Sequence, residues 1–166
     1  MSAMSESFSS EAFREALAHF ASGVTVVATR TEAGPVGFTA SAFTSVSLAP
    51  PLVLVCVGKR ASAYGAVVGA ELFGVSVLAE PQGWIAAQFG RSGIDRFRDV
   101  PLRDGARVPL VDGALAHLEC KRYATHDAGD HTILLGEVVG GRVATGKPLV
   151  HFDRRLGGFV TNGGES

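Results

Sequence analysis

The feature that most constrains the fold is a succession of short, β-branched and apolar segments with no long helix between them. Such segments, bounded by Gly, Pro and polar residues, are typical of β-strands. Because they do not alternate with long helices, a doubly wound parallel sheet is disfavoured, and a closed or nearly closed antiparallel barrel is predicted. The expected strands cover residues 24–30, 36–39, 44–48, 52–57, 72–78, 114–123 and 131–143, with a last short one at 159–161.

Helices in this pattern are few, short and peripheral to the expected barrel. One should begin at residue 9 or 10, where a serine can cap it, and end at Gly23. The apolar residues spaced to share one face of this helix are Phe13, Leu17 and Phe20. Two further helices are expected over 62–68 and 82–89. We therefore expect a mainly β protein with short helices around an antiparallel barrel.

The length of 166 residues fits a single domain over 9–161. A disordered, Ser-rich tail is expected at 1–8 and a Gly-rich polar tail at 162–166. Hydrophobic residues make up 46% of the chain, and the mean hydropathy is +0.25. Either the core is large for this length, or an apolar face is buried in an oligomer.

Charge and cysteine usage exclude several classes of protein. The formal net charge of −1 lacks the basic surplus of a nucleic-acid-binding domain. The longest near-apolar run, 48–57, is too short for a membrane helix and is broken by Pro50 and Pro51. Two cysteines exclude a disulfide scaffold, and Cys56 is expected to pack in the core. With no secretory signal visible, a cytoplasmic location is expected.

Two segments have the spacing of ligand-binding motifs but lack a residue that the chemistry needs. Residues 141–147 match the glycine and lysine spacing of a phosphate-binding P-loop, yet Pro148 stands where Ser or Thr holds Mg²⁺. A Gly-rich turn after a strand is the better interpretation. His117, Cys120 and the loop 126–131 contain metal-ligand residue types, but their spacings match no zinc or calcium motif, so no metal is expected.

The turn that follows residues 52–57 is a candidate anion site. Lys59 and Arg60 come directly after the strand, and a helix is expected to begin near Ser62. Positive charge, a hydroxyl and free backbone N–H groups would then converge, which suits a phosphate or pyrophosphate. A solvated turn before a capped helix explains the same residues equally well.

Small residues and hydroxyls are interleaved through residues 37–47, within an expected barrel strand. Small residues let a flat ligand approach the backbone closely. Hydroxyls and backbone amides there are suited to bonding the polar edge of a heterocycle. A Ser- and Thr-rich edge strand without a ligand is the alternative.

Taken in order, these segments resemble the short-chain NAD(P)H:flavin reductases, the small components of two-component flavin-dependent monooxygenases. The resemblance spans roughly residues 13–159 and depends on the order and spacing of the motifs together. The segments that carry it are 37–57 (GFTASAFTSVSLAPPLVLVCV), 59–64 (KRASAY), 73–78 (FGVSVL), 87–90 (AQFG), 95–97 (DRF), 129–138 (GDHTILLGEV) and 148–155 (PLVHFDRR).

The resemblance implies a split β-barrel with Greek-key strand order, a homodimer, and hydride transfer from NADH or NADPH to FMN or FAD. The reduced flavin would pass to a partner monooxygenase. Carried over position by position, the residues lining the isoalloxazine ring would be Thr39, Ala40, Ser41, Ser45 and Val46. Those at the ribityl phosphate would be Val57, Gly58, Lys59, Ser62 and Ala63, with Phe89 and Gly90 at the phosphate or adenosine end. The nicotinamide would meet the catalytic His131, with His151 and Arg155. A structural strand-end histidine, bonded to Asp130 or to a carbonyl, is the alternative for His131.

The chain departs from the family pattern in a few places. Ala42 stands where Ser is frequent, and His151 and Leu156 stand where aromatic residues are frequent. None of these changes removes a required group, because the cofactor pair carries the hydride chemistry. Two other functions stay open: a non-catalytic flavin-binding carrier or sensor, and another split-barrel flavin oxidoreductase. The choices between FMN and FAD, and between NADH and NADPH, also stay open.

Overall fold

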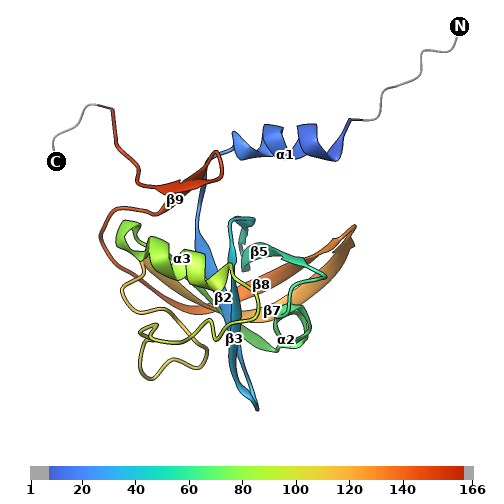
Figure 1. Ribbon diagram of the computed structural model, residues 1–166. Coiled ribbons are helices and arrows are strands. Elements are labelled where there is room, and N and C mark those ends of the chain that lie inside the picture. The colour runs from blue at the N-terminus through green and yellow to red at the C-terminus, as the bar shows by residue number, and fades with distance from the viewer. Residues whose placement is uncertain (1–7, 163–166) are drawn as a thin grey trace, which may run out of the picture.

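The main body of the molecule is one seven-stranded antiparallel sheet, seen in the computed structural model, which describes residues 8–162 (Figure 1). Nearly all of the two expected tails lies outside the described residues. The strands are β2 (Thr25–Thr31), β3 (Gly34–Ala40), β4 (Phe43–Leu48), β5 (Pro51–Gly58), β6 (Leu72–Val77), β7 (Ala116–Ala128) and β8 (His131–Val143). Their order across the sheet is β3-β2-β6-β7-β8-β5-β4.

The two edge strands of this sheet, β3 and β4, follow each other in the chain. Only residues 41 and 42 separate them, and the backbone N–H of Cys56 donates to the carbonyl of Ala42 at 3.0 Å. The sheet therefore curls back on itself, while the long-range pairs β2–β6 and β5–β8 give Greek-key order. The predicted antiparallel split barrel is confirmed.

The core has two parts because β2 is buried on both of its faces. Val27 faces the barrel interior, where it joins Val55, Phe73 and other buried residues. Its neighbour Val26 faces the other way, into a cluster with Phe89 of α3 (Gly83–Phe89). The helix α2 (Tyr64–Gly69) packs its Val67 into the first cluster, and a 3₁₀ turn (Glu80–Gln82) leads into α3. Alternation along a strand is the reason that one strand serves both clusters.

One glycine is required by close packing inside the barrel. A Cβ at Gly136 would lie 2.5 Å from Cζ of Phe73 and 2.9 Å from Cβ of Cys120. The Phe73 ring therefore packs directly on the backbone of β8. Burial also raises the pKa of the Cys120 thiol to about 12, so this cysteine stays protonated and unreactive near neutral pH.

The N-terminal helix α1 (Ser10–Ala18) stands apart from the barrel (Figure 1). Its cap is Ser9, whose Oγ accepts from the N–H of Ala12 at 3.1 Å. The helix ends earlier than the expected Gly23, because residues 22 and 23 pair with another strand. The apolar face predicted for it is largely exposed in the chain: Phe13 is 56%, Leu17 51% and Phe20 72% exposed.

A second, three-stranded sheet lies beside α1, and the sequence did not predict it as such. It consists of β1 (Ser22–Gly23), β9 (Val150–Phe152) and β10 (Arg155–Gly157), while 159–161, expected to be a strand, has no regular structure. The β9–β10 turn uses Asp153 and Arg154 at φ of 48° and 60°. Sequence normally signals such a turn with Asn-Gly or Asp-Gly, which is absent here.

Other boundaries differ modestly from the expectation. The helix expected from residue 62 begins at Tyr64, and β7 continues to Ala128, well past residue 123. No helix in residues 8–162 combines the length and the apolar character that crossing a membrane requires.

Candidate functional site

The candidate site is the rim of the barrel where β5 ends beside the beginning of β8. Gly58 and His131 are register partners at this rim. A Cβ at Gly58 would lie 3.6 Å from Nε2 of His131, so the imidazole lies close to the glycine backbone. The fold thus brings the predicted phosphate turn and the predicted catalytic histidine together, although Gly58 and His131 are 73 positions apart in the sequence.

The Lys59 side chain is held by the tip of the β7–β8 hairpin. Its ammonium forms an ion pair with Oδ1 of Asp127 and donates to the carbonyl of Gly129 at 2.6 Å. The backbone N–H of Lys59 also donates to the carbonyl of Asp130, at 2.9 Å. The hydrogen bond with Asp127 is the main reason that the pKa of Lys59 is raised. This cation is therefore fixed at the rim and fully charged.

His131 lies at the rim with its side chain 47% exposed. Its Nδ1 is 2.7 Å from Oδ1 of Asp130, and this hydrogen bond lowers the pKa of the Asp130 carboxyl. An ionised carboxylate only accepts, so Nδ1 carries the proton. In the neutral imidazole, Nε2 is then left as an acceptor near Gly58.

Thr132, the residue that follows His131, is hydrogen-bonded to α2. The hydroxyl of Tyr64 lies 2.8 Å from Oγ1 of Thr132, which ties the start of α2 to β8. At the other end of α2, Nη1 of Arg122 donates to the carbonyls of Val68 and Gly69 at 3.1 and 3.3 Å. The helix α2 is thus clamped at both ends against the long hairpin, which steadies the site.

The strip at residues 39–46 presents fewer hydroxyls than its composition suggests. Oγ1 of Thr39 donates to the carbonyl of Ala86 at 2.6 Å, so this side chain faces α3. Ala40 is 6% exposed and packs in the barrel core. Ser41, Ser45 and Val46 are exposed and remain available to a ligand.

The remaining predicted flavin contacts divide between backbone and side chain. Val57, Ala63 and Phe89 are fully buried, so only their backbone groups can face a ligand. The Phe89 ring packs edge-on against Phe97, with centroids 4.8 Å apart. Ser62 and Gly90 are exposed.

A largely apolar cleft of about 800 Å³ lies between α1, the segment 41–44 and the outer face of β5. Cys56 lines it and is half-buried, which corrects the expectation that this thiol packs in the core. The cause is strand alternation, because Val55 and Val57 take the inward positions. The thiol therefore faces the cleft.

The two predicted nicotinamide residues of the C-terminal hairpin lie away from His131. His151, in β9, lines the cleft together with Ser41, whereas Arg155, in β10, is exposed outside that cleft. Figure 1 shows β9 on the opposite side of the molecule from the free end of β7, where the turn to His131 lies. The structure brings Gly58, Lys59 and His131 together, but it does not add His151 or Arg155 to them within one chain.

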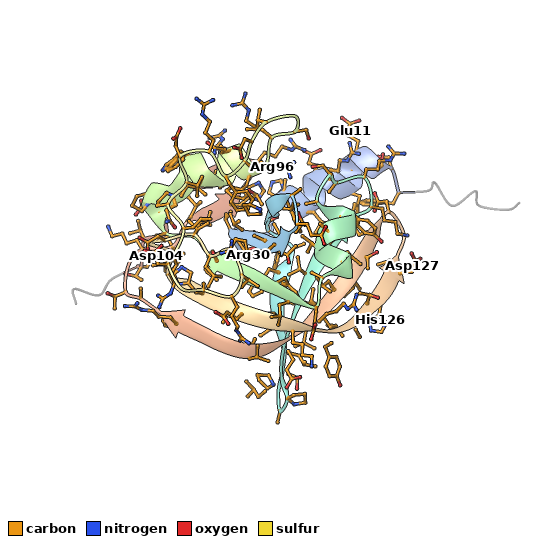
Figure 2. All side chains as sticks on the ribbon, turned by 90° about the horizontal axis from the view of Figure 1, so that it is seen from below. Glu11, Arg30, Arg96, Asp104, His126 and Asp127 are labelled. Carbon is orange, nitrogen blue, oxygen red and sulfur yellow. The ribbon has the colours of Figure 1, made fainter. Side chains whose placement is uncertain are left out.

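Sequence reasoning missed the roles of Tyr64 and Asp127 at the rim. The bond between His131 and Asp130 was the alternative expected for a structural strand-end histidine, and the structure contains it. Figure 2 shows Asp127, next to His126, at the outer end of the hairpin. Asp127 lies near the end of β7, two residues before Gly129, where Asp is common for conformational reasons, so its sequence context pointed to the turn alone. Only the pairing of β8 with β5 shows that Asp127 faces Lys59.

The residues considered as metal ligands have structural roles. A ring nitrogen of His117 lies 2.6 Å from the carbonyl of Val111, and Cys120 is buried. Within residues 8–162, no three His, Cys, Asp or Glu side chains gather closely enough to hold a metal ion.

Comparison with known proteins identifies the family. A family model described as a flavin reductase like domain matches residues 17–159. The chain belongs to the flavin reductase-like family. The motif-based family prediction is thereby confirmed, over most of the length of this flavin reductase-like chain.

Named relatives of this flavin reductase-like chain include reductases and reductase components. It is 43% identical over 151 residues to the FMN reductase (NADH) SmoA of Agrobacterium fabrum, covering 90% of this chain and 86% of that protein. It is 38% identical over 148 residues to the reductase component of a 4-nitrophenol 4-monooxygenase/4-nitrocatechol 2-monooxygenase of Rhodococcus opacus, covering 89% and 80%.

A solved structure supports the same assignment. The NADH:FAD oxidoreductase SgcE6 of Streptomyces globisporus, in complex with NAD and FAD fragments, superimposes with a TM-score of 0.85 at 38% identity. The match covers 90% of this chain and 92% of that one.

Proposed function

We propose that this chain is an NAD(P)H:flavin oxidoreductase that transfers hydride to FMN or FAD and supplies the reduced flavin to a partner monooxygenase. The observation that carries the proposal is the rim, where the pairing of Gly58 with His131 joins a fixed cation to an exposed imidazole. The named relatives support both FMN and FAD as the flavin, since they include an FMN reductase (NADH) and an NADH-dependent FAD reductase.

The residues present fit a flavin. The hydrogen bond from Cys56 to Ala42 sets the largely exposed segment at 41–46 beside the end of β5, three residues before Lys59. Three strand residues span about 10 Å, so a hydroxyl-bearing surface and a cation lie in line at a separation suited to a flat ring with a phosphate tail. We propose that Ser41, Ser45 and Val46 contact the ring and that Lys59 and Ser62 contact the phosphate.

The chain's own groups orient reactants and supply no covalent step. A bound flavin accepts hydride from reduced nicotinamide, and this chemistry belongs to the cofactor pair. Asp130 holds His131 in the orientation that leaves Nε2 at the rim. There Nε2 is placed to bond a second ligand, and alignment of two rings is itself a large source of rate.

A turnover assay tests the function. Mixing the protein with NADH and a large excess of FMN or FAD should give continuous loss of nicotinamide absorbance, through many equivalents per protein chain. Flavin binding with one turnover or none would instead indicate a carrier or sensor. Turnover that requires a small amine in place of NADH would indicate another split-barrel oxidoreductase. The same assay with NADPH decides the donor.

We also propose that the protein is a homodimer. The exposed Phe13 and Leu17 of α1 and Phe20 just after it, together with the apolar cleft beside them, form a surface too apolar to suit open solvent. Obligate homodimers bury more than about 2,000 Å² in total, with interfaces that resemble a cut core. A second copy seated on α1 would cover both the helix face and the cleft.

Sedimentation checks the dimer. At micromolar concentration the protein should sediment at twice the chain mass of 17.2 kDa, and Leu17→Glu should shift it toward the monomer. The matched control is Glu11→Lys, a charge change that helical spacing places on the other face of α1 from Phe13, and it should leave the dimer intact. A stable monomer of the unaltered protein would refute the proposal.

We also propose a cytoplasmic location. Cys56 and Cys120 are both free thiols in the structure, which suits a reducing compartment. The NADH named for the relatives is also an intracellular electron donor.

A further inference from the structure

We propose that Asp127 is a built-in competitor of the flavin phosphate for Lys59. In the free protein its carboxylate occupies one donor of the ammonium that the phosphate is to use, so a phosphate that takes more than one donor displaces it. Asp127 then keeps flavin affinity low enough for the reduced flavin to leave. The inference rests on the proposed reductase function and on Lys59 contacting the phosphate.

The geometry gives the Lys59 ammonium two partners from one hairpin tip. Oδ1 of Asp127 accepts one of its hydrogen bonds and the carbonyl of Gly129, at 2.6 Å, accepts another. An ammonium has three donors, so one is left for an incoming anion. A phosphate that takes more than one donor has to displace either the Gly129 carbonyl or the Asp127 carboxylate.

The carboxylate is the partner that an anion displaces more easily. Two anions on one ammonium repel each other, whereas a neutral carbonyl and an anion do not. The Asp127 side chain is also 79% exposed and can turn into solvent, whereas the Gly129 carbonyl belongs to the backbone of the turn. Released carboxylate would be solvated at once, so the exchange leaves no buried charge behind.

The hairpin presents this carboxylate in a fixed place. Asp127 is the register partner of Thr132, and Thr132 is tied to Tyr64 of α2 at 2.8 Å. Figure 2 shows Asp127 at the outer end of the hairpin, on the strand that precedes the turn to His131. Because β8 also pairs with β5, the tip that carries Asp127 cannot drift away from Lys59.

Asp130 provides a matched comparison at the same hairpin tip. It carries the same charge and is likewise exposed, but its carboxylate bonds Nδ1 of His131 at 2.7 Å and not the Lys59 ammonium. Replacing either aspartate with asparagine removes one negative charge from the tip. Only the Asp127 replacement releases the cation.

The experiment compares FMN with riboflavin, which has the same ring and no phosphate. Dissociation constants are measured by equilibrium titration of flavin fluorescence for the unaltered protein, Asp127→Asn and Asp130→Asn. For FMN, Asp127→Asn should lower the Kd about 2- to 5-fold, the range measured for exposed ion pairs. Riboflavin affinity should not change, and Asp130→Asn should tighten FMN binding by less than Asp127→Asn does.

A second variant tests whether the effect runs through Lys59. In a Lys59→Met background, adding Asp127→Asn should no longer change FMN affinity, because the contested cation is absent. An unchanged FMN Kd in Asp127→Asn, or an equal gain for riboflavin, would overturn the inference. NADH turnover by the unaltered protein is measured in parallel, so that failure of the reductase proposal is recognised separately.

Discussion

Replacing His131 by alanine should lower kcat/KM for the reduced nicotinamide about 5- to 150-fold while flavin affinity changes little. That range corresponds to about 1–3 kcal/mol, the loss expected when one hydrogen bond to a reacting complex is removed. The structural reason is that His131 is half-exposed at the rim, with Nδ1 occupied by Asp130 and Nε2 near Gly58. Steady-state kinetics with varied NADH at saturating flavin measures the effect.

Two further variants separate the roles of the imidazole and its partner. His131→Gln keeps a polar group at the rim and should recover part of the lost rate. Asp130→Asn leaves the ring in place but weakens its orientation, so it should reduce kcat/KM less than His131→Ala does. If His131→Ala lowers the melting temperature while kcat/KM for NADH stays at its original value, the histidine is a structural strand-end residue and its catalytic assignment is wrong.

Replacing Lys59 by alanine should raise the Kd for FMN about 5- to 150-fold, the cost of losing a charge-assisted hydrogen bond to phosphate. The rate at saturating flavin should be nearly unchanged, because the phosphate is not altered during hydride transfer. The ammonium is already fixed at the rim by Asp127 and Gly129, so the site loses a positioned charge. Titration of flavin fluorescence measures the Kd, and turnover at excess flavin measures the rate.

The neighbouring cation and riboflavin serve as controls for Lys59. Arg60→Ala removes the same charge one residue away, from an exposed position, and should weaken FMN binding less. Riboflavin affinity should be insensitive to Lys59→Ala. Equal losses in the two variants would mean that affinity follows the net charge of the turn, and an unchanged FMN Kd would mean that the phosphate binds elsewhere.

Local patterns along the chain were sufficient for much of the fold. The strand expected at 131–143 is β8 with the same bounds, because a Gly turn precedes it and apolar residues run through it. Ser9 or Ser10 was expected to cap the first helix, and Ser9 is the cap, since capping depends on a hydroxyl directly before the first turn. The family resemblance added what no local pattern contains, namely the Greek-key order of the strands.

Local patterns failed where a residue's role depends on a distant partner. The apolar repeat Phe13, Leu17 and Phe20 was expected to form one helical face, and whether anything covers that face was not predictable locally; within residues 8–162 it is largely exposed. Thr39 was expected among the ligand hydroxyls, but α3 lies close enough to accept its hydrogen bond. The Asp153–Arg154 turn contains no Gly or Asn, so its sequence did not predict a hairpin ending in β10.

The sequence by itself determined that this is a mainly β, flavin reductase-like chain, with a lysine after one strand and a histidine at the start of another. Only the tertiary structure decided that the two lie on one rim, through the pairing of Gly58 with His131. It also decided that Asp127 holds the lysine and that Asp130 orients the histidine. The physical reason is that strand periodicity and turn preference are set by near neighbours, whereas ion pairs and hydrogen bonds at a site require atoms that only long-range strand pairing brings within reach.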